Sequence, residues 1–249
     1  MNFLLIIAAS DSSGGAGMQN DIRVVSDFGY WPLSALTGIT VQNFNHVFKV
    51  KPVEPSLLKQ QIQVCLNDFN IKAIKIGALC SMDNLKTIKE CLCENQNLPI
   101  VFDPVLLSSS GKPFLPTKAI NYINKHFLPI PTLITPNKLE LELLTNCRIK
   151  NFSEGVSIAS LYAKEFRTSV FLKGGHFDES TVNEALVFND GKVLMYSHPR
   201  YIFKYSHGTG CTLSTAIACL LAEGLSLEQA CPKASEYVAT RFLRIGNEM

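Results

Sequence analysis

The sequence has 249 residues, of which 47% are apolar, and its 23 basic and 21 acidic residues leave a net charge of +2. The charges are dispersed, without the basic block that marks a nucleic-acid-binding face. No stretch approaches the roughly 20 apolar residues that span a membrane. The length fits one large α/β domain or two small ones, and an anionic small molecule remains a suitable ligand because local fields matter more than net charge.

The cysteine pattern favours a reducing compartment. The eight cysteines form no C-x-x-C pair and no Cys/His cluster with zinc spacing, and a chain of this length does not need disulfides. Residues 1–9 are apolar, but the run is short and lacks the positive charge that begins a signal peptide. We therefore expect a cytoplasmic protein whose first segment is a buried strand.

Segments with strand and helix periodicity alternate along the chain. The apolar run at 71–76 is typical of a strand, whereas Leu58, Ile62 and Leu66 fall on one face of a helix. The Asp190-Gly191 turn predicts a hairpin. In chain order, the predicted elements are a strand at 3–9, a helix at 16–28, a strand at 35–41, a helix at 56–69, a strand at 71–76, a helix at 84–93, a strand at 100–102, a helix at 117–127, a strand at 132–135, helices at 137–144 and 154–166, strands at 169–173, 184–188 and 193–196, and helices at 210–222 and 227–243.

This order predicts an α/β fold with a mostly parallel sheet, helices on both faces and an antiparallel edge hairpin. Without repeats or an obvious linker, residues 1–249 are expected to form a single domain. Ligands bind beyond the carboxyl ends of the strands in such sheets, and polar or glycine-rich groups follow most of the predicted strands. These groups are residues 11–17, 42–43, 77, 103–104, 135–137, 173–176 and 207–212.

The strongest of these groups is H-G-T-G-C-T at 207–212, which leads directly into a predicted helix. Its glycines allow backbone N–H groups to converge, and the helix start adds partial positive charge, so the segment is suited to bind an anion. Cys211 falls in the first turn, where a thiol pKa tends to fall, and could act as a base or a nucleophile. The structural alternative is a tight turn that buries a cysteine.

The other groups are ambiguous when each is taken alone. Residues 10–17 match neither of the standard glycine-rich phosphate motifs. Asn137 with Glu140 fits a helix capping box. Asp103 fits either a Mg²⁺ ligand or an Asx-turn, and Lys173 fits either a phosphate ligand or a solvated lysine.

Together, however, these segments resemble the hydroxymethylpyrimidine/phosphomethylpyrimidine kinases of thiamine biosynthesis, in the ribokinase-like superfamily. The resemblance covers nearly the whole chain in order, and H-G-T-G-C-T matches letter for letter. The other similar segments are I-A-A-S-D-S-S-G-G-A-G-M-Q-N-D at 7–21, V-Q-N at 41–43, K-I-G at 75–77, D-P-V at 103–105, I-T-P-N-K-L-E at 134–140 and L-K-G-G-H at 172–176. The fold implied is a ribokinase-like three-layer sandwich.

The resemblance also implies roles for particular residues, in a reaction that uses ATP and Mg²⁺. The first glycine-rich loop would close on the pyrimidine, and Cys211 would take the proton of its hydroxymethyl group. The implied catalytic residues are Cys211, Gly208 and Gly210. The implied substrate-binding residues are Ala9, Gly15, Ala16, Asp21, Gln42 and Val105. The implied nucleotide-binding residues are Asn137, Lys173, Gly175 and Thr209. Asp103 and Glu140 would hold Mg²⁺.

Four positions depart from the family pattern. Ser12 replaces a proline and Ser206 replaces a threonine. Ala78 replaces a methionine, which would enlarge the substrate pocket. Ser109 replaces a lysine, which removes one phosphate contact.

Other functions remain open at this stage. A pyridoxine or pyridoxal kinase would share the fold and the anion site. A Cys211-nucleophile transferase or hydrolase, with His207 as its base, belongs to another class, as does a binding module without catalysis. The adenine-binding residues are expected around 187–205 and in the last helix, the segment 106–116 is expected to be a lid, and the resemblance allows a homodimer.

Overall fold

The computed structural model describes residues 1–248 apart from 96, 108–110, 112, 176 and 178–180. The strands are β1 (Phe3–Ser10), β2 (Trp31–Gln42), β3 (Val47–Pro52), β4 (Ile71–Ile76), β5 (Ile100–Phe102), β6 (Leu133–Ile134), β7 (Ser169–Leu172), β8 (Thr181–Val187) and β9 (Val193–Pro199). The helices are α1 (Gly17–Asp27), α2 (Pro55–Asp68), α3 (Met82–Leu92), α4 (Lys118–Tyr122), the π-helical η1 (Ile123–Phe127), α5 (Lys138–Thr145), α6 (Phe152–Phe166), α7 (Thr209–Ala222) and α8 (Leu227–Glu248).

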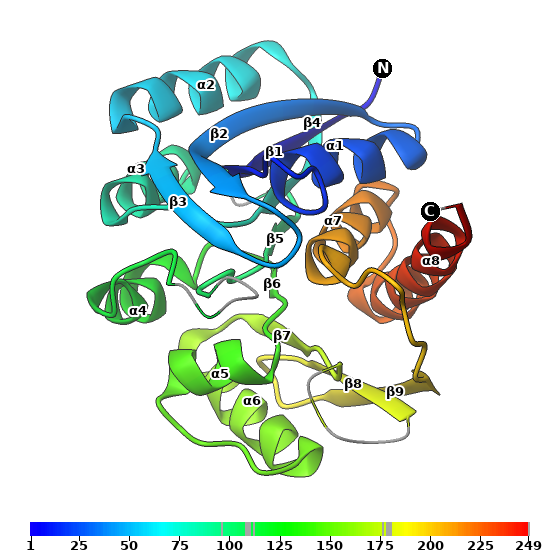
Figure 1. Ribbon diagram of the computed structural model, residues 1–249. Coiled ribbons are helices and arrows are strands. Elements are labelled where there is room, and N and C mark those ends of the chain that lie inside the picture. Colours follow the sequence, from blue (N-terminus) through cyan, green and yellow to red (C-terminus); the bar gives the residue numbers. More distant parts are fainter. Residues whose placement is uncertain (96, 108–110, 112, 176, 178–180, 249) are drawn as a thin grey trace.

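Within the described residues the strands form one nine-stranded sheet in the order β3-β2-β1-β4-β5-β6-β7-β8-β9. The strands from β2 to β7 in this order pair in parallel, and β8 and β9 add an antiparallel hairpin at one edge. The mostly parallel sheet and its edge hairpin, predicted from the sequence, are confirmed. The first strand, β1, is the third strand from the β3 edge and has neighbours on both sides (Figure 1).

The opposite edge carries an antiparallel strand that the sequence analysis missed. This strand, β3, pairs with the end of β2. Its residues Phe48, Lys49, Lys51 and Pro52 are exposed, so it has no buried face and leaves no apolar alternation in the sequence. An edge strand whose two faces are both largely exposed lacks the alternation of apolar and polar residues by which strands are predicted.

The sheet separates two layers of helices (Figure 1). Leu4 and Ile6 of β1 pack in the core with α1, α7 and α8, whereas the alternate residues Leu5 and Ile7 pack with α2, α3 and the helices from α4 to α6. A strand buried on both faces must be apolar at every position, because successive side chains point to opposite sides. This explains why 3–9 is a continuous apolar run.

The segment 117–127 differs from the single helix that was expected. It consists of the short helix α4 followed by the π-helical turn η1. Both Ile123 and Phe127 are fully buried, and the wider turn places these two side chains in the same core. Among the described residues, no helix combines the length and the apolar character needed to cross a membrane.

The two-sided burial of β1 leads to a stability prediction. Leu5→Ala should lower the free energy of unfolding by about 2–5 kcal/mol, because Leu5 is fully buried and truncation leaves a cavity. Leu161→Ala, at a site where the side chain is 72% exposed, is the matched control and should change it by less than about 0.5 kcal/mol. Urea denaturation of both variants measures the difference, and equal losses would contradict the packing.

Candidate active site

One cavity of about 1130 Å³ opens at the carboxyl ends of the parallel strands. Its walls combine the segments that follow β1, β2, β4, β5, β6 and β7 with the start of α7. The residues implied by the family resemblance that line it are Ala9, Ala16, Gln42, Asp103, Val105, Asn137, Glu140, Lys173, Gly175, Gly208, Thr209, Gly210 and Cys211. Asp21 and Gly15 are not among the lining residues.

The floor of the cavity is the start of α7. Gly208 has a φ of +89°, which L side chains rarely adopt, and the helix begins at Thr209. The first N–H groups of an α-helix have no intrahelical acceptor, so those at Gly210 and Cys211 suit an anion. A Cβ added at Gly210 would lie 3.3 Å from Lys173 Nζ. The backbone N–H groups at the start of α7 and the ammonium group of Lys173 therefore face the same part of the cavity, where both can bind an anion.

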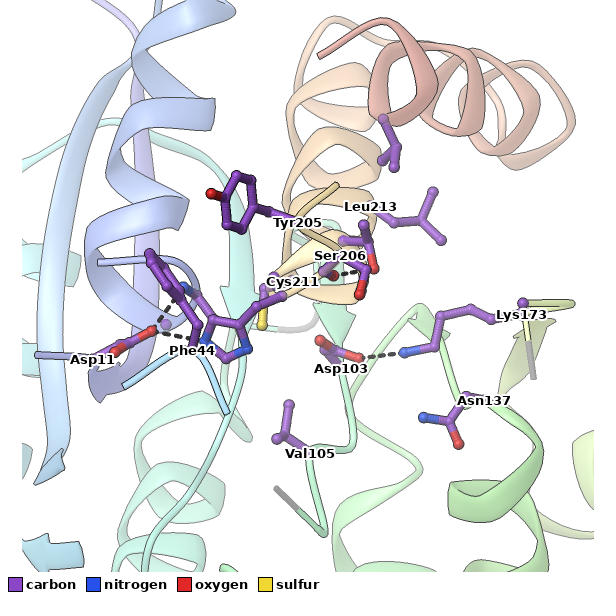
Figure 2. A pocket seen from close by; sticks show the side chains of 18 of the residues that line it. Asp11, Phe44, Asp103, Val105, Asn137, Lys173, Tyr205, Ser206, Cys211 and Leu213 are labelled. Atoms are coloured by element: carbon purple, nitrogen blue, oxygen red, sulfur yellow. Dashed lines mark hydrogen bonds and ion pairs between the residues drawn. The ribbon is translucent and has the colours of Figure 1, made fainter. Parts of the chain in front are cut away.

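Cys211 differs from its expected chemistry. Burial raises the pKa of its thiol to about 12, against the opposing effects of Lys75 and the Gly17 N–H. The expected lowering by the helix start is therefore wrong for this protein, because the loss of solvation outweighs it. The thiol faces the cavity between Asp11 and Asp103 (Figure 2).

His207 does not serve Cys211. Its Nε2 lies 3.0 Å from Asp11 Oδ2, so the imidazole interacts with a carboxylate of the glycine-rich loop. This arrangement, together with the raised thiol pKa, does not support the Cys–His nucleophile considered from the sequence.

Lys173 and Asp103 meet across the cavity from Asp11 (Figure 2), and Glu140 joins them. Lys173 Nζ lies 2.9 Å from Asp103 Oδ1 and 3.3 Å from Glu140 Oε2, and Thr135 Oγ1 donates to Asp103 Oδ1. Burial opposes ionisation of Asp103, but Lys173, Lys75 and these hydrogen bonds together lower its pKa. Lys173 is therefore a buried cation rather than a solvated lysine.

Glu140 has a structural and an electrostatic role together. Its side chain accepts from the Asn137 N–H while Asn137 Oδ1 accepts from the Glu140 N–H, so the predicted capping box is confirmed. Burial nevertheless raises the pKa of Glu140 to about 7, because Lys173 only partly offsets the burial and Asp103 adds repulsion. The capping and site interpretations of this motif are compatible.

Asp21 lies beneath the cavity in a buried ion pair that sequence analysis did not anticipate. Lys75 Nζ is 2.5 Å from Asp21 Oδ2, both side chains are fully buried, and Thr215 Oγ1 donates to Asp21 Oδ1. A direct contact of Asp21 with substrate is therefore not supported. The signal for Lys75 was present in the sequence, since a lysine inside the apolar strand 71–76 must be paired when it is buried.

The far end of the cavity is formed by the β8–β9 hairpin, the chain after it, and α8. This end is lined by Val182, Glu184, His198, Arg200, Tyr201, Phe203, Ser235, Val238 and Ala239. Burial raises the pKa of Glu184, which accepts from Ser235 Oγ at 2.5 Å. The segments named from the sequence for adenine, 187–205 and the last helix, both contribute to this end.

The departures from the family pattern have different surroundings. Ala78 lines the cavity, and Ser12 Oγ accepts from the Gln42 N–H and donates to the Gln42 carbonyl. Ser206 also lines the cavity. Ser109, part of the predicted lid 106–116, and His176 lie outside the described residues.

Among the described residues, no group of three or more His, Cys, Asp or Glu side chains is arranged to hold a metal ion. Asp103 and Glu140 are two carboxylates only, and both face Lys173. Mg²⁺ commonly takes one or two protein carboxylates and completes its shell with phosphates and water. The donor set therefore fits a metal ion that arrives with phosphate groups.

The sheet, the helices on its two faces and the cavity at the carboxyl ends of its strands have the ribokinase-like architecture of small-molecule kinases. A family model described as phosphomethylpyrimidine kinase matches residues 11–246. The chain is 32% identical over 238 residues to the hydroxymethylpyrimidine/phosphomethylpyrimidine kinase of Haemophilus influenzae, covering 94% of this chain and 88% of that protein. It therefore belongs to the phosphomethylpyrimidine kinase family.

Solved structures agree with this assignment. The crystal structure of phosphomethylpyrimidine kinase from Clostridium difficile is 32% identical, with a TM-score of 0.82 over 97% of this chain and 99% of that one. Pyridoxal kinase from Staphylococcus aureus, solved with AMP-PCP and pyridoxal, is 26% identical, with a TM-score of 0.85 over 97% and 88%. The ribokinase-like fold expected from the resemblance is confirmed.

The raised pKa of Glu140 gives a testable pH dependence. The carboxyl of Glu140 has a pKa of about 7 in the folded protein and 4.5 as its ordinary value. Its contribution to the free energy of unfolding is therefore greatest below about pH 4.5, where it is protonated in both states. This contribution is lost as the pH rises to about 7, because the folded state then has to bury an ionised carboxylate. Glu140→Gln keeps the capping hydrogen bond but cannot ionise. The stability of this variant relative to the original protein should therefore be about 1–3 kcal/mol more favourable at about pH 8 than at about pH 5. Urea denaturation at both values tests this, and a pH-independent effect would contradict the shift.

The raised pKa of Cys211 predicts slow alkylation. At neutral pH only a very small fraction of a thiol with a pKa of about 12 is thiolate, and the thiolate is the nucleophile. Iodoacetamide should modify the exposed Cys147 at least about 100-fold faster than Cys211. Time-resolved peptide mass spectrometry measures both rates in one sample, and comparable rates would show that Cys211 is activated.

Proposed function

We propose that this protein transfers the γ-phosphoryl group of ATP to the hydroxymethyl oxygen of 4-amino-5-hydroxymethyl-2-methylpyrimidine, and then phosphorylates the resulting monophosphate, in thiamine biosynthesis. The observation that carries the proposal is the convergence of the 207–212 loop with Lys173 and its two carboxylates on one cavity, in a chain of this kinase family. In the reaction the hydroxymethyl oxygen bonds to Pγ, the bond from Pγ to the ADP oxygen breaks, and the hydroxyl proton is released.

The residues of the cavity wall form two groups, according to the phosphate groups that they bind. Gly208 and Gly210 let the N–H groups at the start of α7 face the transferring phosphoryl group. Lys173, Thr209, Asn137 and Gly175 bind the nucleotide phosphates. Such positioning and charge neutralisation make up most of the catalysis of phosphoryl transfer.

Asp103 and Glu140 hold Mg²⁺ together with those phosphates. The ion neutralises phosphate charge when it is bound. For Glu140 to act as a ligand it must be ionised, and its raised pKa is lowered by a nearby cation. Lys173 already offsets part of the effect of burial on this pKa, and the bound ion would offset more of it.

Cys211 takes the hydroxyl proton in this proposal. Its raised pKa sets a condition, because the thiol must first become a thiolate. Lys75 and the Gly17 N–H favour that thiolate, and the ion pair with Asp21 holds Lys75 beneath the cavity. Asp21 thus contributes indirectly, by positioning Lys75.

The acceptor ring lies among residues from the ends of β1 and β2 and from the 103–105 segment. Gln42 hydrogen-bonds the ring, while Ala9, Ala16 and Val105 give apolar contacts. These residues line the same side of the molecule as the glycine-rich loop, whose glycines at 14 and 17 have positive φ values. A Cβ added at Gly15 would collide with His207 and Phe44, so glycine at this position lets the loop pack closely against both rings.

A pyridoxal kinase activity is the second candidate. It is supported by the likeness to the pyridoxal kinase of Staphylococcus aureus and by Ala78, whose small side chain leaves space in the cavity wall.

Two features of the whole protein also stay predictions. One is that residues 1–249 form a single domain, and the other is that the protein forms a homodimer. Sedimentation velocity tests the homodimer.

Turnover with two acceptors tests the function. Purified protein with ATP and Mg²⁺ should release ADP with hydroxymethylpyrimidine at a higher kcat/KM than with pyridoxal. No ADP release above background with either acceptor would contradict the kinase assignment. A preference for pyridoxal would transfer the assignment to the second candidate.

Replacement of Cys211 tests the base. Cys211→Ala should lower kcat by about 10²- to 10⁴-fold, the usual contribution of general acid–base catalysis, with little change in ATP affinity. Steady-state kinetics and nucleotide titration on the same preparation separate the two effects. Turnover like that of the original protein would refute the base assignment.

A further inference from the structure

Two loops from opposite ends of the chain are packed backbone to backbone at the edge of the cavity. One is the glycine-rich loop 10–17 after β1, and the other is the segment 205–208 before α7. A Cβ added at Gly208 would lie 2.0 Å from the Gly15 carbonyl oxygen, and one added at Gly15 would lie 2.5 Å from the His207 ring. Gly208 accepts no side chain without displacing the backbone of the first loop, and a side chain at Gly15 would displace the rings of His207 and Phe44.

The side chain of Asp11 organises the first loop and reaches the second. Its Oδ1 accepts from the N–H and hydroxyl of Ser13, both at 2.7 Å, and its Oδ2 accepts from the Ala16 N–H at 2.8 Å. The same Oδ2 lies 3.0 Å from His207 Nε2. Asp11 is 2% exposed, so this network lies in the wall of the cavity rather than on the surface.

Aromatic rings lie beside the junction and line the cavity with it. Phe44, from the segment after β2, has its ring centroid 6.1 Å from those of both His207 and Tyr205. Figure 2 shows Phe44 beside Asp11, with Tyr205 above them. The burial of Asp11 limits solvent around the pair, which strengthens a charge-assisted hydrogen bond.

We propose that Asp11 and His207 act as a positioning pair that fixes the spacing between the acceptor-binding loop and the anion-binding start of α7. The proposal rests on the proposed function, in which the acceptor hydroxyl and the phosphoryl group meet between these two segments. Neither residue touches the reacting atoms in this proposal. Loss of the pair shifts one loop relative to the other, and a displacement of the order of 1 Å can cost about 100-fold in rate.

The pair has a consequence for kinetics that a purely structural contact lacks. Lys173, Asn137 and Gly175 follow β6 and β7, away from the pair, so its disruption leaves most of the proposed nucleotide contacts in place, although Thr209 follows the shifted segment. His207→Phe, which keeps a ring but removes the donor, should lower kcat about 10- to 100-fold while the KM for ATP changes less than about 3-fold. His207→Gln, which keeps an N–H donor, should recover most of that kcat.

Amide hydrogen exchange gives a readout that does not depend on turnover. In His207→Phe without substrates, the amides of 13–16 should exchange at least about 10-fold faster, although the substitution lies in the other loop. Tyr237→Phe is the matched control. It removes a 2.7 Å hydrogen bond between α8 and Asp27 of α1, and it should leave both kcat and exchange at 13–16 unchanged.

The outcomes separate this proposal from the proposed function. Unchanged exchange at 13–16 in His207→Phe overturns the pair even if the protein is an active kinase. Faster exchange with unchanged kcat also overturns it, because the contact would then be structural only. If the original protein has no kinase activity, the proposed function fails, and the positioning role fails with it whatever the exchange shows.

Discussion

The parallel direction of the strands from β2 to β7 is the constraint on which the rest of this molecule depends. Parallel pairing brings the carboxyl ends of all these strands to one edge of the sheet, so segments that lie far apart in the sequence line a single cavity. Both faces of the sheet must then be covered by helices. The same constraint makes the central strand β1 almost wholly apolar, and it places most of the polar chemistry in the residues that follow the strands, with Lys75 of β4 as an exception.

The charged side chains near that edge are almost completely buried, and each carboxylate faces a lysine. Lys173 is shared by Asp103 and Glu140, and Lys75 is held by Asp21. Removing one partner of a buried pair costs more than the pair itself contributes, because an uncompensated charge remains. The charges around Lys173 do not cancel, because the two carboxylates of Asp103 and Glu140 face one lysine, and the pKa of Glu140 is raised. In the proposed reaction, this excess of carboxylate is what a phosphate-bound cation neutralises.

Several local motifs at this edge serve the fold and the site together. The capping box of α5 satisfies the helix start, and its Glu140 also pairs with Lys173. Gly15 and Gly208 let two loops approach closely, and the positive φ of Gly208 also forms the turn into α7. Such overlap explains why each motif, taken alone, supported a structural interpretation as well as a functional one.

The sequence by itself determined the order and type of most elements, and the bounds of β4 and β5 match the predicted 71–76 and 100–102. These strands are apolar runs with clear ends, and periodicity is a local property that short segments carry on their own. The same reasoning missed β3 and the π-helical end of 117–127, since the first has no buried face and the second follows from core packing.

For the site, the sequence located the loop 207–212 and the groups after each strand, because glycine and charged residues at strand ends are visible without coordinates. Only the tertiary structure decided how they pair. Asp11 and His207 are 196 positions apart, and Lys75 and Asp21 are 54 apart, so no spacing rule connects them. Burial likewise reversed the expected pKa of Cys211, because desolvation depends on everything packed around the thiol and not on its place in a helix.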